Sequence, residues 1–196
     1  DVAVKGIVNI LDGCKENKIK ELYLASSSEV YQTPKKIPTD ESEMLKVPDV
    51  HNPRYSYGGG KILTEIMGVN YGKKFFKKLI IFRPHNVYGS DMGNEHVIPE
   101  FINRFKHLKT NYFRIQGSGN ETRSFIYIDD FVSAFNLLLK KGKHLGIYNI
   151  GTSERISIKN LAKMMSNLLN KKIIFKKLPI KKGGTKNRLP NISKIK

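Results

Sequence analysis

The sequence alternates segments of helical periodicity with short apolar runs. Residues Val2–Asn17 carry apolar side chains at helical spacing and are followed by the apolar run Glu21–Ala25. The same order recurs in Tyr57–Phe75 and Leu79–Phe82. Short, continuous apolar runs are typical of strands that helices cover on both faces. The alternation therefore predicts an α/β fold built on a doubly wound parallel sheet.

Two long polar segments and several shorter elements complete the pattern. Residues 26–55 hold four prolines and are too irregular for a helix or a strand, which predicts a functional loop. Residues 84–95, rich in Gly, Asn and His, predict a second loop. The other predicted helices cover Val97–Leu108, a segment capped by Asp129 or Asp130 that ends at Lys141, and a segment capped by Ser157 that ends at Leu169; the other strands cover Tyr112–Gln116, Phe125–Ile128, Ile147–Ile150 and Lys172–Leu178.

The formal net charge of +18 would suit a nucleic-acid-binding protein, because a basic surface attracts phosphate polyanions. The basic residues, however, are mostly lysines, many of them in scattered doublets such as Lys35-Lys36, Lys73-Lys74 and Lys181-Lys182, without zinc-finger spacing or an RNP-like strand. We therefore expect no nucleic-acid binding. A single surface stripe of these doublets would favour the opposite conclusion.

The apolar content excludes a membrane protein. No apolar run approaches the roughly 20 residues that span a bilayer, and no signal segment opens the chain at Asp1, so we expect a cytoplasmic protein that contacts no membrane. The one cysteine, Cys14, lies among residues of helical periodicity and is expected to be a buried structural thiol.

The clearest local motif is Tyr57-Gly58-Gly59-Gly60-Lys61. A spacing of four places the tyrosine and the lysine on one helical face, where a cation favours the phenolate form of a phenol and makes it a usable general base. Each glycine costs a helix about 1 kcal/mol relative to alanine, which indicates close approach of a ligand or of another segment. The alternative is an exposed helical pair without function.

Hydroxyl side chains follow the first predicted strand. Ser26, Ser27 and Ser28 come directly after Ala25, and ligands of open α/β sheets bind outside the carboxyl ends of the strands. The serines would then face the site. A polar turn held by its own hydroxyl groups is the alternative.

Four motifs in order resemble the extended short-chain dehydrogenases/reductases that act on nucleotide sugars. They are the segment Ser26–Tyr31, the motif from Tyr57 to Lys61, and the segments Arg83–Gly89 and Gly117–Asp130. This family of NAD-dependent epimerases and dehydratases includes UDP-glucose 4-epimerase, dTDP-glucose and GDP-mannose 4,6-dehydratases and UDP-glucuronate decarboxylase. The resemblance implies a partial Rossmann-like sheet with a smaller C-terminal α/β substrate-binding region.

The resemblance also implies the catalytic residues. Tyr57 resembles the catalytic base, and Lys61 resembles the residue that binds the nicotinamide ribose and favours the phenolate. Ser27 resembles the hydroxyl that bonds the sugar 4-hydroxyl group. Together these residues would oxidise C4 while NAD accepts the hydride, and NADP remains an open alternative. Tyr57, Lys61, Pro84 and His85 would contact the cofactor.

The substrate-binding residues follow from the same resemblance. Arg123 and Arg188 would pair with the diphosphate, for which the planar guanidinium fork is suited. Asn86 would contact the same diphosphate, and His96, Val97 and Gln116 would surround the nucleotide. The implied partner is a nucleotide-diphosphate sugar. No side-chain cluster predicts a metal site, and a homodimer is the expected assembly.

The family's Gly-rich phosphate turn would lie before Asp1, so the resemblance implies an N-terminally truncated chain whose activity alone is in doubt. Residues 1–90 would complete the dinucleotide-binding domain, and residues 91–196 would mainly bind the nucleotide sugar while interleaving with the sheet.

Glu29 discriminates between the reactions of the family. Dehydratases of the dTDP-sugar type carry Asp-Glu after the catalytic hydroxyl, whereas this chain has Ser28-Glu29, as GDP-mannose dehydratases and UDP-glucuronate decarboxylases more nearly do. A carboxylate near C5 can remove the acidic hydrogen of a 4-keto sugar. A 4-epimerase needs no such step. The sequence supports an epimerase and a dehydratase almost equally. A decarboxylase-like enzyme and a noncatalytic NAD-dependent binding protein are the alternatives.

Overall fold

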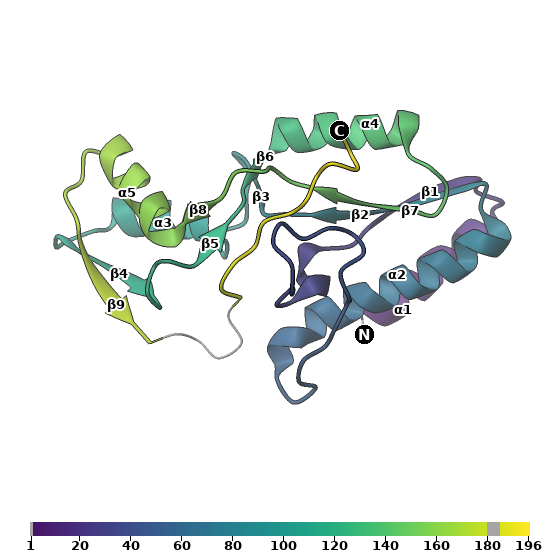
Figure 1. Cartoon of the computed structure of the whole chain (residues 1–196), viewed down its shortest axis with the longest axis horizontal. Coiled ribbons are helices and arrows are strands. Elements are labelled where there is room, and N and C mark those ends of the chain that lie inside the picture. The colour runs from purple at the N-terminus through teal and green to yellow at the C-terminus, as the bar shows by residue number, and fades with distance from the viewer. Residues whose placement is uncertain (1, 180–184) are drawn as a thin grey trace.

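Three parallel strands, in the order β1-β2-β7, form the central sheet in the computed structural model, which describes residues 2–179 and 185–196. The strands are β1 (Glu21–Ala25), β2 (Lys78–Pro84) and β7 (Gly146–Ile150). Helices α1 (Val2–Glu16) and α2 (Ser56–Phe75) cover one face and α4 (Ile128–Lys141) covers the other (Figure 1). This three-layer unit, called the first lobe below, confirms the predicted parallel α/β sheet.

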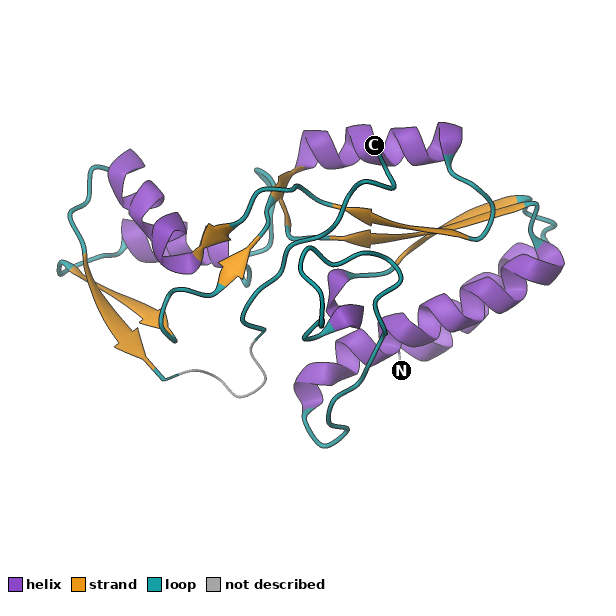
Figure 2. Ribbon diagram, in the orientation of Figure 1, coloured by secondary structure: helices purple, strands orange, loops and turns teal. Residues whose placement is uncertain are grey.

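The alternation of side chains along β2 explains why this strand is apolar throughout. Leu79 and Ile81 pack with α1 and α2 in one buried cluster. Ile80 and Phe82 point to the opposite face and pack with α4 in another. Because helices cover both faces of the sheet (Figure 2), none of these four side chains is more than 9% exposed.

A second lobe contains the remaining larger elements. Its core joins Phe101, Phe105, Phe113 and Ile115 to the helix residues around Leu161. Of the two short strand pairs, β3 with β6 packs in the cluster around Ile80 of the first lobe, whereas β8, which pairs with β5, packs against the core of the second lobe. The bounds are β3 (Val87–Tyr88), α3 (Val97–Lys106), β4 (Tyr112–Gln116), β5 (Thr122–Arg123), β6 (Ile126–Tyr127), β8 (Ile156–Ser157), α5 (Ile158–Leu168) and β9 (Ile174–Leu178), with β4 and β9 parallel.

The C-terminal segment, residues 185–196, returns from the second lobe to the first (Figure 1). The amide of Thr39 donates to the carbonyl of Leu189 at 2.8 Å, and the amide of Asn191 donates to the carbonyl of Thr39 at 2.7 Å. Since β7 also belongs to the central sheet, the chain passes between the two lobes more than once.

The helix ends bear out one of the two predicted caps. Ser157 caps α5, because its Oγ accepts from the amide of Asn160 at 3.1 Å. The prediction of Asp129 or Asp130 as the cap of α4 is wrong: the N-cap is Tyr127 and both carboxylates lie in the first turn. A carboxylate there still interacts favourably with the helix dipole, which is why the sequence pattern resembles a cap.

The loop at residues 26–55 contains two short 3₁₀ helices, η1 (Ser28–Tyr31) and η2 (Pro53–Tyr55). Cys14 is half-buried against the cluster beneath α1. No helix in the described ranges is long and apolar enough to cross a membrane. The doublet Lys181-Lys182 and the pair Gly183-Gly184 lie outside the described residues.

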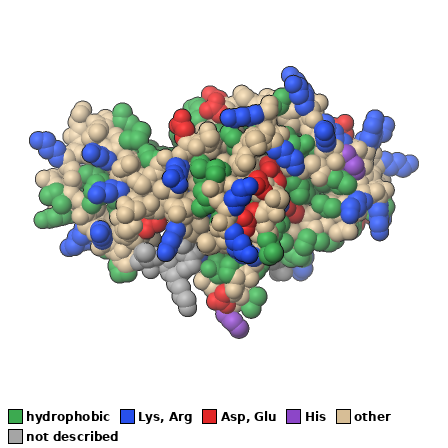
Figure 3. Space-filling model, in the orientation of Figure 1, with side chains coloured by type: hydrophobic (Ala, Val, Ile, Leu, Met, Phe, Trp, Pro, Cys, Tyr) green, Lys and Arg blue, Asp and Glu red, His purple; other side chains and the backbone are tan. Residues whose placement is uncertain are grey.

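The basic side chains form no single stripe on the face shown in Figure 3. Lys and Arg are dispersed there among hydrophobic and acidic side chains. On this face the distribution is that of a solvated basic surface.

Two of the three glycines at the start of α2 allow another segment to approach the helix. A β-carbon on Gly58 would lie 2.9 Å from the carbonyl oxygen of Glu29 in η1, and one on Gly60 would lie 2.8 Å from the β-carbon of Ala3. The nearest neighbour of a β-carbon on Gly59 would be Val47, at 3.4 Å. The close approach predicted from these glycines is therefore confirmed at two positions.

These contacts predict opposite effects for neighbouring substitutions. Gly58→Ala should lower the free energy of unfolding by about 1–3 kcal/mol, because the added methyl group forces η1 away from α2. Gly59→Ala should raise it by up to about 1 kcal/mol, because alanine favours the helix. Urea unfolding of both variants measures the difference. Equal stability of the two variants would contradict the packing described here.

Candidate active site

The candidate site lies at the carboxyl ends of β1 and β2. The two strands end side by side, with Ala25 opposite Phe82. The N-terminal end of α2 lies against η1, which directly follows β1. In open α/β sheets this edge is where ligands bind.

Tyr57 and Lys61 stand together at this edge. The Nζ atom of Lys61 donates to the carbonyl oxygen of Ala25 at 2.7 Å and lies 5.9 Å from the centroid of the Tyr57 ring. The tyrosine side chain is 56% exposed, so its hydroxyl can be reached from solvent. An ammonium group has three donors, and the bond to Ala25 leaves two for a ligand.

The first two of the three serines after β1 have different surroundings. Ser26 is buried, and its hydroxyl donates to a carboxylate oxygen of Glu65 in α2. Ser27 is half-buried and caps η1, where its Oγ accepts from the amide of Glu29 at 3.2 Å. Of these two hydroxyls, that of Ser27 is the one nearer the open edge, since Ser26 is held inside the fold.

Glu29 forms a two-pronged ion pair with Arg188 from the C-terminal segment. Its Oε2 accepts from Nη2 of the arginine at 2.7 Å, and its Oε1 accepts from Nη1. Nη2 of Arg188 also donates to Thr185 at 2.9 Å. Burial alone would raise the pKa of Glu29, but the hydrogen bonds and charge of Arg188, aided by Arg54 and Arg123, hold that pKa below its usual range.

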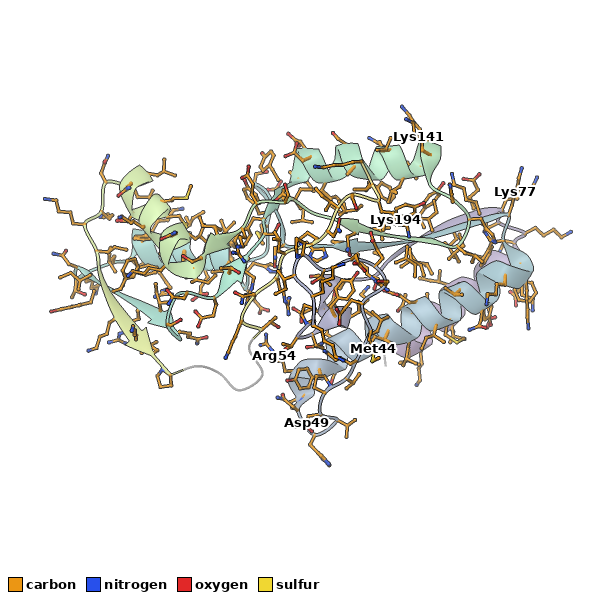
Figure 4. The ribbon with its side chains drawn as sticks, viewed as in Figure 1. Met44, Asp49, Arg54, Lys77, Lys141 and Lys194 are labelled. Atoms are coloured by element: carbon orange, nitrogen blue, oxygen red, sulfur yellow. The ribbon has the colours of Figure 1, made fainter. Side chains whose placement is uncertain are left out.

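Three arginines therefore surround one carboxylate. Arg123 in β5 is half-buried and donates to its neighbour's carbonyl, that of Thr122, at 2.8 Å. Burial and the charges of Arg188 and Arg54 lower the pKa of Arg123 to about 10. Arg54 in η2 is exposed and lies beyond the start of α2, on the side of the second lobe (Figure 4). The excess of positive charge suits an anionic ligand.

The residues after β2 are held by the fold. The backbone amide of His85 donates to Ile150 at 2.8 Å, and its Nε2 lies 3.3 Å from Oδ1 of Asn149. Burial, together with the charges of Arg188 and Arg83, lowers the pKa of His85 to about 4 despite the bond to Asn149. The imidazole is therefore neutral near pH 7.

The other sequence-predicted residues occupy two regions. Pro84 ends β2, and Asn86, with a positive φ of 40°, donates from its amide to the carbonyl of Ser124 at 2.8 Å. His96 is exposed at the N-cap of α3, Val97 packs against the core of the second lobe, and Gln116 is exposed at the end of β4. The arginines around Glu29 and the start of α2, which carries Tyr57 and Lys61, both border η1, whereas these last three residues lie in the second lobe.

A buried polar network, for which the sequence predicted no role, lies beneath the site. Glu65 accepts from Nε and Nη2 of Arg83 at 2.8 and 2.6 Å, and the two side chains are 5% and 2% exposed. Nη1 of Arg83 donates to the hydroxyl of Tyr31 at 2.7 Å, which in turn donates to Asn149 at 2.8 Å. The sequence feature that could have drawn attention to Glu65 is its spacing, since it follows Tyr57 and Lys61 at the same interval of four residues.

Comparison with known proteins identifies the family. The model of the NAD dependent epimerase/dehydratase family matches residues 1–151. The chain is 34% identical to dTDP-D-glucose 4,6-dehydratase of Dictyostelium discoideum over 170 residues, which are 84% of this chain and 39% of that protein. It is 34% identical to the Homo sapiens dTDP-D-glucose 4,6-dehydratase over 168 residues, which are 86% of this chain and 46% of that protein. The chain thus spans less than half the length of these relatives.

Solved structures share the fold. UDP-N-acetylglucosamine 4-epimerase from Methanobrevibacter ruminantium M1, in complex with UDP-N-acetylmuramic acid, matches with a TM-score of 0.87 and 25% identity, over 98% of this chain and 61% of that one. A double mutant of the dTDP-glucose 4,6-dehydratase DesIV from Streptomyces venezuelae, with NAD and DAU bound, matches with a TM-score of 0.85 and 20% identity, over 98% and 58%. The chain belongs to the NAD-dependent epimerase/dehydratase family, as its motifs predicted.

The buried His85 predicts a specific loss of stability in mild acid. An unfolded histidine binds a proton near pH 6.5, whereas His85 in the folded chain does so only near pH 4. Between these values the unfolded state binds the extra proton, so stability is complete above pH 6.5 and falls as the pH falls. The loss should be about 2 kcal/mol between pH 6.5 and pH 5.

Urea unfolding at these two pH values measures this loss. The His85→Gln variant cannot titrate at this position. Its loss of free energy of unfolding between the two pH values should therefore be smaller than that of the parent, by the amount given above. The interpretation fails if the parent and the variant lose equal stability.

Proposed function

We propose that this chain provides the catalytic centre of an enzyme that transiently oxidises a nucleoside-diphosphate sugar at C4. One observation carries the proposal: Tyr57 and Lys61 lie together at the end of β1, next to the serine segment that contains Ser27. A base, a cation and a hydroxyl at a ligand-binding edge are the groups needed to remove the proton of a sugar hydroxyl.

Each residue has a defined task in this proposal. Ser27 hydrogen-bonds the C4 oxygen, and Tyr57, as phenolate, takes the proton of the C4 hydroxyl. Lys61 favours the phenolate by its charge and offers its remaining donors to ribose hydroxyls. Bound NAD supplies the acceptor for the C4 hydride. Loss of the proton and the hydride leaves a 4-keto sugar, and return of both completes the cycle.

The residues present fit NAD at this edge. The ammonium of Lys61 retains two donors beside an exposed phenol, and Pro84 and His85 form the neighbouring end of β2. The family is named for NAD, and the DesIV structure contains it. We therefore propose NAD rather than NADP as the cofactor.

The arginine cluster is the proposed diphosphate site. Arg123 and Arg54 carry guanidinium groups whose charges act on Glu29 and on each other. Arg188, which the sequence also assigned to the diphosphate, already has three N–H groups bonded to Glu29 and Thr185. The contacts therefore favour Arg123 and Arg54 as the direct ligands, with Arg188 adding its charge. Asn86 borders this site, and His96, Val97 and Gln116 are the proposed nucleotide contacts.

Two reactions can follow from the 4-keto sugar, and Glu29 separates them. Both of its oxygens are bonded to Arg188, and its lowered pKa makes it a weak base. This geometry favours 4-epimerisation, which leaves C5 untouched. The named relatives favour a 4,6-dehydratase, in which a base removes the C5 hydrogen. We place epimerisation first and dehydration second.

The shared oxidation step is tested with Tyr57→Phe in the full protein that contains these residues. The variant should lose at least about 100-fold in turnover while it retains its affinity for the nucleotide sugar, because only the proton acceptor is removed. Tyr112→Phe, an exposed tyrosine in β4, is the matched control and should keep the parental rate. A Tyr57→Phe enzyme with more than about a tenth of the parental turnover would refute the assignment.

Turnover in deuterated water distinguishes the two reactions. Epimerisation should leave C5 unlabelled, and Glu29→Gln should change turnover by less than about tenfold, or 1.4 kcal/mol, because that group transfers no proton. Solvent deuterium at C5, combined with loss of activity in Glu29→Gln, would instead establish the dehydratase. Deuterium with release of carbon dioxide from a uronic-acid sugar would identify a decarboxylase. Mass spectrometry of the product reads all three outcomes.

A further inference from the structure

A small cavity lies beside Arg188, the ion-pair partner of Glu29. Its free volume is about 10 Å³, and Ser28, His85 and Arg188 are among its lining residues. Three segments meet there: the loop after β1, the end of β2 and the C-terminal segment. A volume of this size holds one water molecule.

Two of the lining residues each carry a buried polar atom without a hydrogen-bond partner among the described residues. These atoms are Nδ1 of His85 and Nε of Arg188. The two residues are 2% and 8% exposed. Buried polar side-chain atoms are nearly always paired with protein or with ordered water. Because the two residues that carry these atoms line the same cavity, a water molecule held there can serve both.

The surrounding bonds determine which atom of His85 carries the proton. The Nδ2 group of Asn149 donates to the carbonyls of Thr39 and Asn191, at 3.0 and 3.3 Å, so the amide oxygen faces the other way. That oxygen accepts from Tyr31 at 2.8 Å and lies 3.3 Å from Nε2 of His85. Nε2 must therefore be the donor. In a neutral imidazole, Nδ1 is then an acceptor.

We propose that the cavity is a binding site for a single water molecule that donates to Nδ1 of His85 and accepts from the Nε–H group of Arg188. The occupant must both donate and accept. A monatomic anion has no proton to donate to the lone pair of Nδ1, protonated oxyanions are too large for this volume, and a metal cation cannot accept from a guanidinium N–H. Water satisfies both groups and matches the volume.

The site makes His85 a positioning residue for Arg188. Tyr31 and Nε2 of His85 both donate to the amide oxygen of Asn149, the water donates to Nδ1 of His85, and the Nε–H group of Arg188 donates to the water. The Nη groups of Arg188 hold Glu29. The guanidinium of Arg188 is then held through its Nη groups and through Nε. Because its orientation is fixed, the carboxylate of Glu29 that it bonds is oriented as well. This inference does not depend on which sugar reaction the protein performs.

The parent protein gives the first test. In ¹⁵N-labelled protein near pH 7, the imidazole spectrum of His85 should show a protonated Nε2 and an unprotonated Nδ1. A crystal structure at high resolution should show one ordered water between Nδ1 and the Nε atom of Arg188. A proton on Nδ1, or a direct contact that leaves no density for water, would overturn the proposal.

A variant gives the second test, with the pKa of Glu29 as the readout. His85→Phe keeps a buried ring of similar size but removes the acceptor, so Arg188 should hold the carboxylate less firmly and the pKa of Glu29 should rise toward that of an ordinary glutamate. His107→Phe, an exposed histidine in the second lobe, should cause no shift. Carboxyl ¹³C titration by NMR measures both variants.

The two tests fail separately. A folded His85→Phe protein with an unchanged Glu29 titration would refute the positioning role. If that variant does not fold, the spectrum and density of the parent protein still decide whether the water site exists.

Discussion

The buried ion pair between Arg83 and Glu65 is the interaction on which the arrangement of the site depends. It joins the end of β2 to the middle of α2, and its further hydrogen bonds reach Ser26 after β1 and Tyr31 in η1. Removing one partner from such a pair leaves an uncompensated buried charge and costs about 3–5 kcal/mol. The position of each element that carries a proposed catalytic residue is therefore coupled to this single contact.

Helix α2 connects this buried ion pair with two of the proposed catalytic residues through its spacing. Tyr57, Lys61 and Glu65 follow one another at intervals of four residues and so occupy one face of the helix. The first is exposed at the open edge, the second bonds the end of β1, and the third is buried with Arg83. One face of the helix is therefore exposed to solvent at Tyr57 and buried in an ion pair two turns later at Glu65. Because Lys61 and Glu65 anchor the helix to the sheet, the position of the Tyr57 backbone relative to the sheet is fixed.

The sequence was sufficient to predict the parallel sheet and the pairing of Tyr57 with Lys61, because both depend on local periodicity. It could not predict that Glu29 and Arg188, which are 159 residues apart, bond each other, since only the tertiary fold brings them together. Arg54 was missed for the same reason. The wrong cap of α4 shows a further limit: a carboxylate near a helix start is favourable at several positions, so the sequence does not fix the boundary.

The return of residues 185–196 to the first lobe has a consequence for biosynthesis. Arg188 and the carbonyl of Asn191 complete contacts with Glu29 and Asn149, residues that a ribosome makes much earlier. Before the ribosome has made this segment, the strands of the central sheet are already present and can pair. The edge that carries Glu29 still lacks its contacts with Arg188. Contacts of such long sequence separation form slowly, because the intervening chain must first lose its freedom. Completion of this edge is therefore a late step in the folding of these residues.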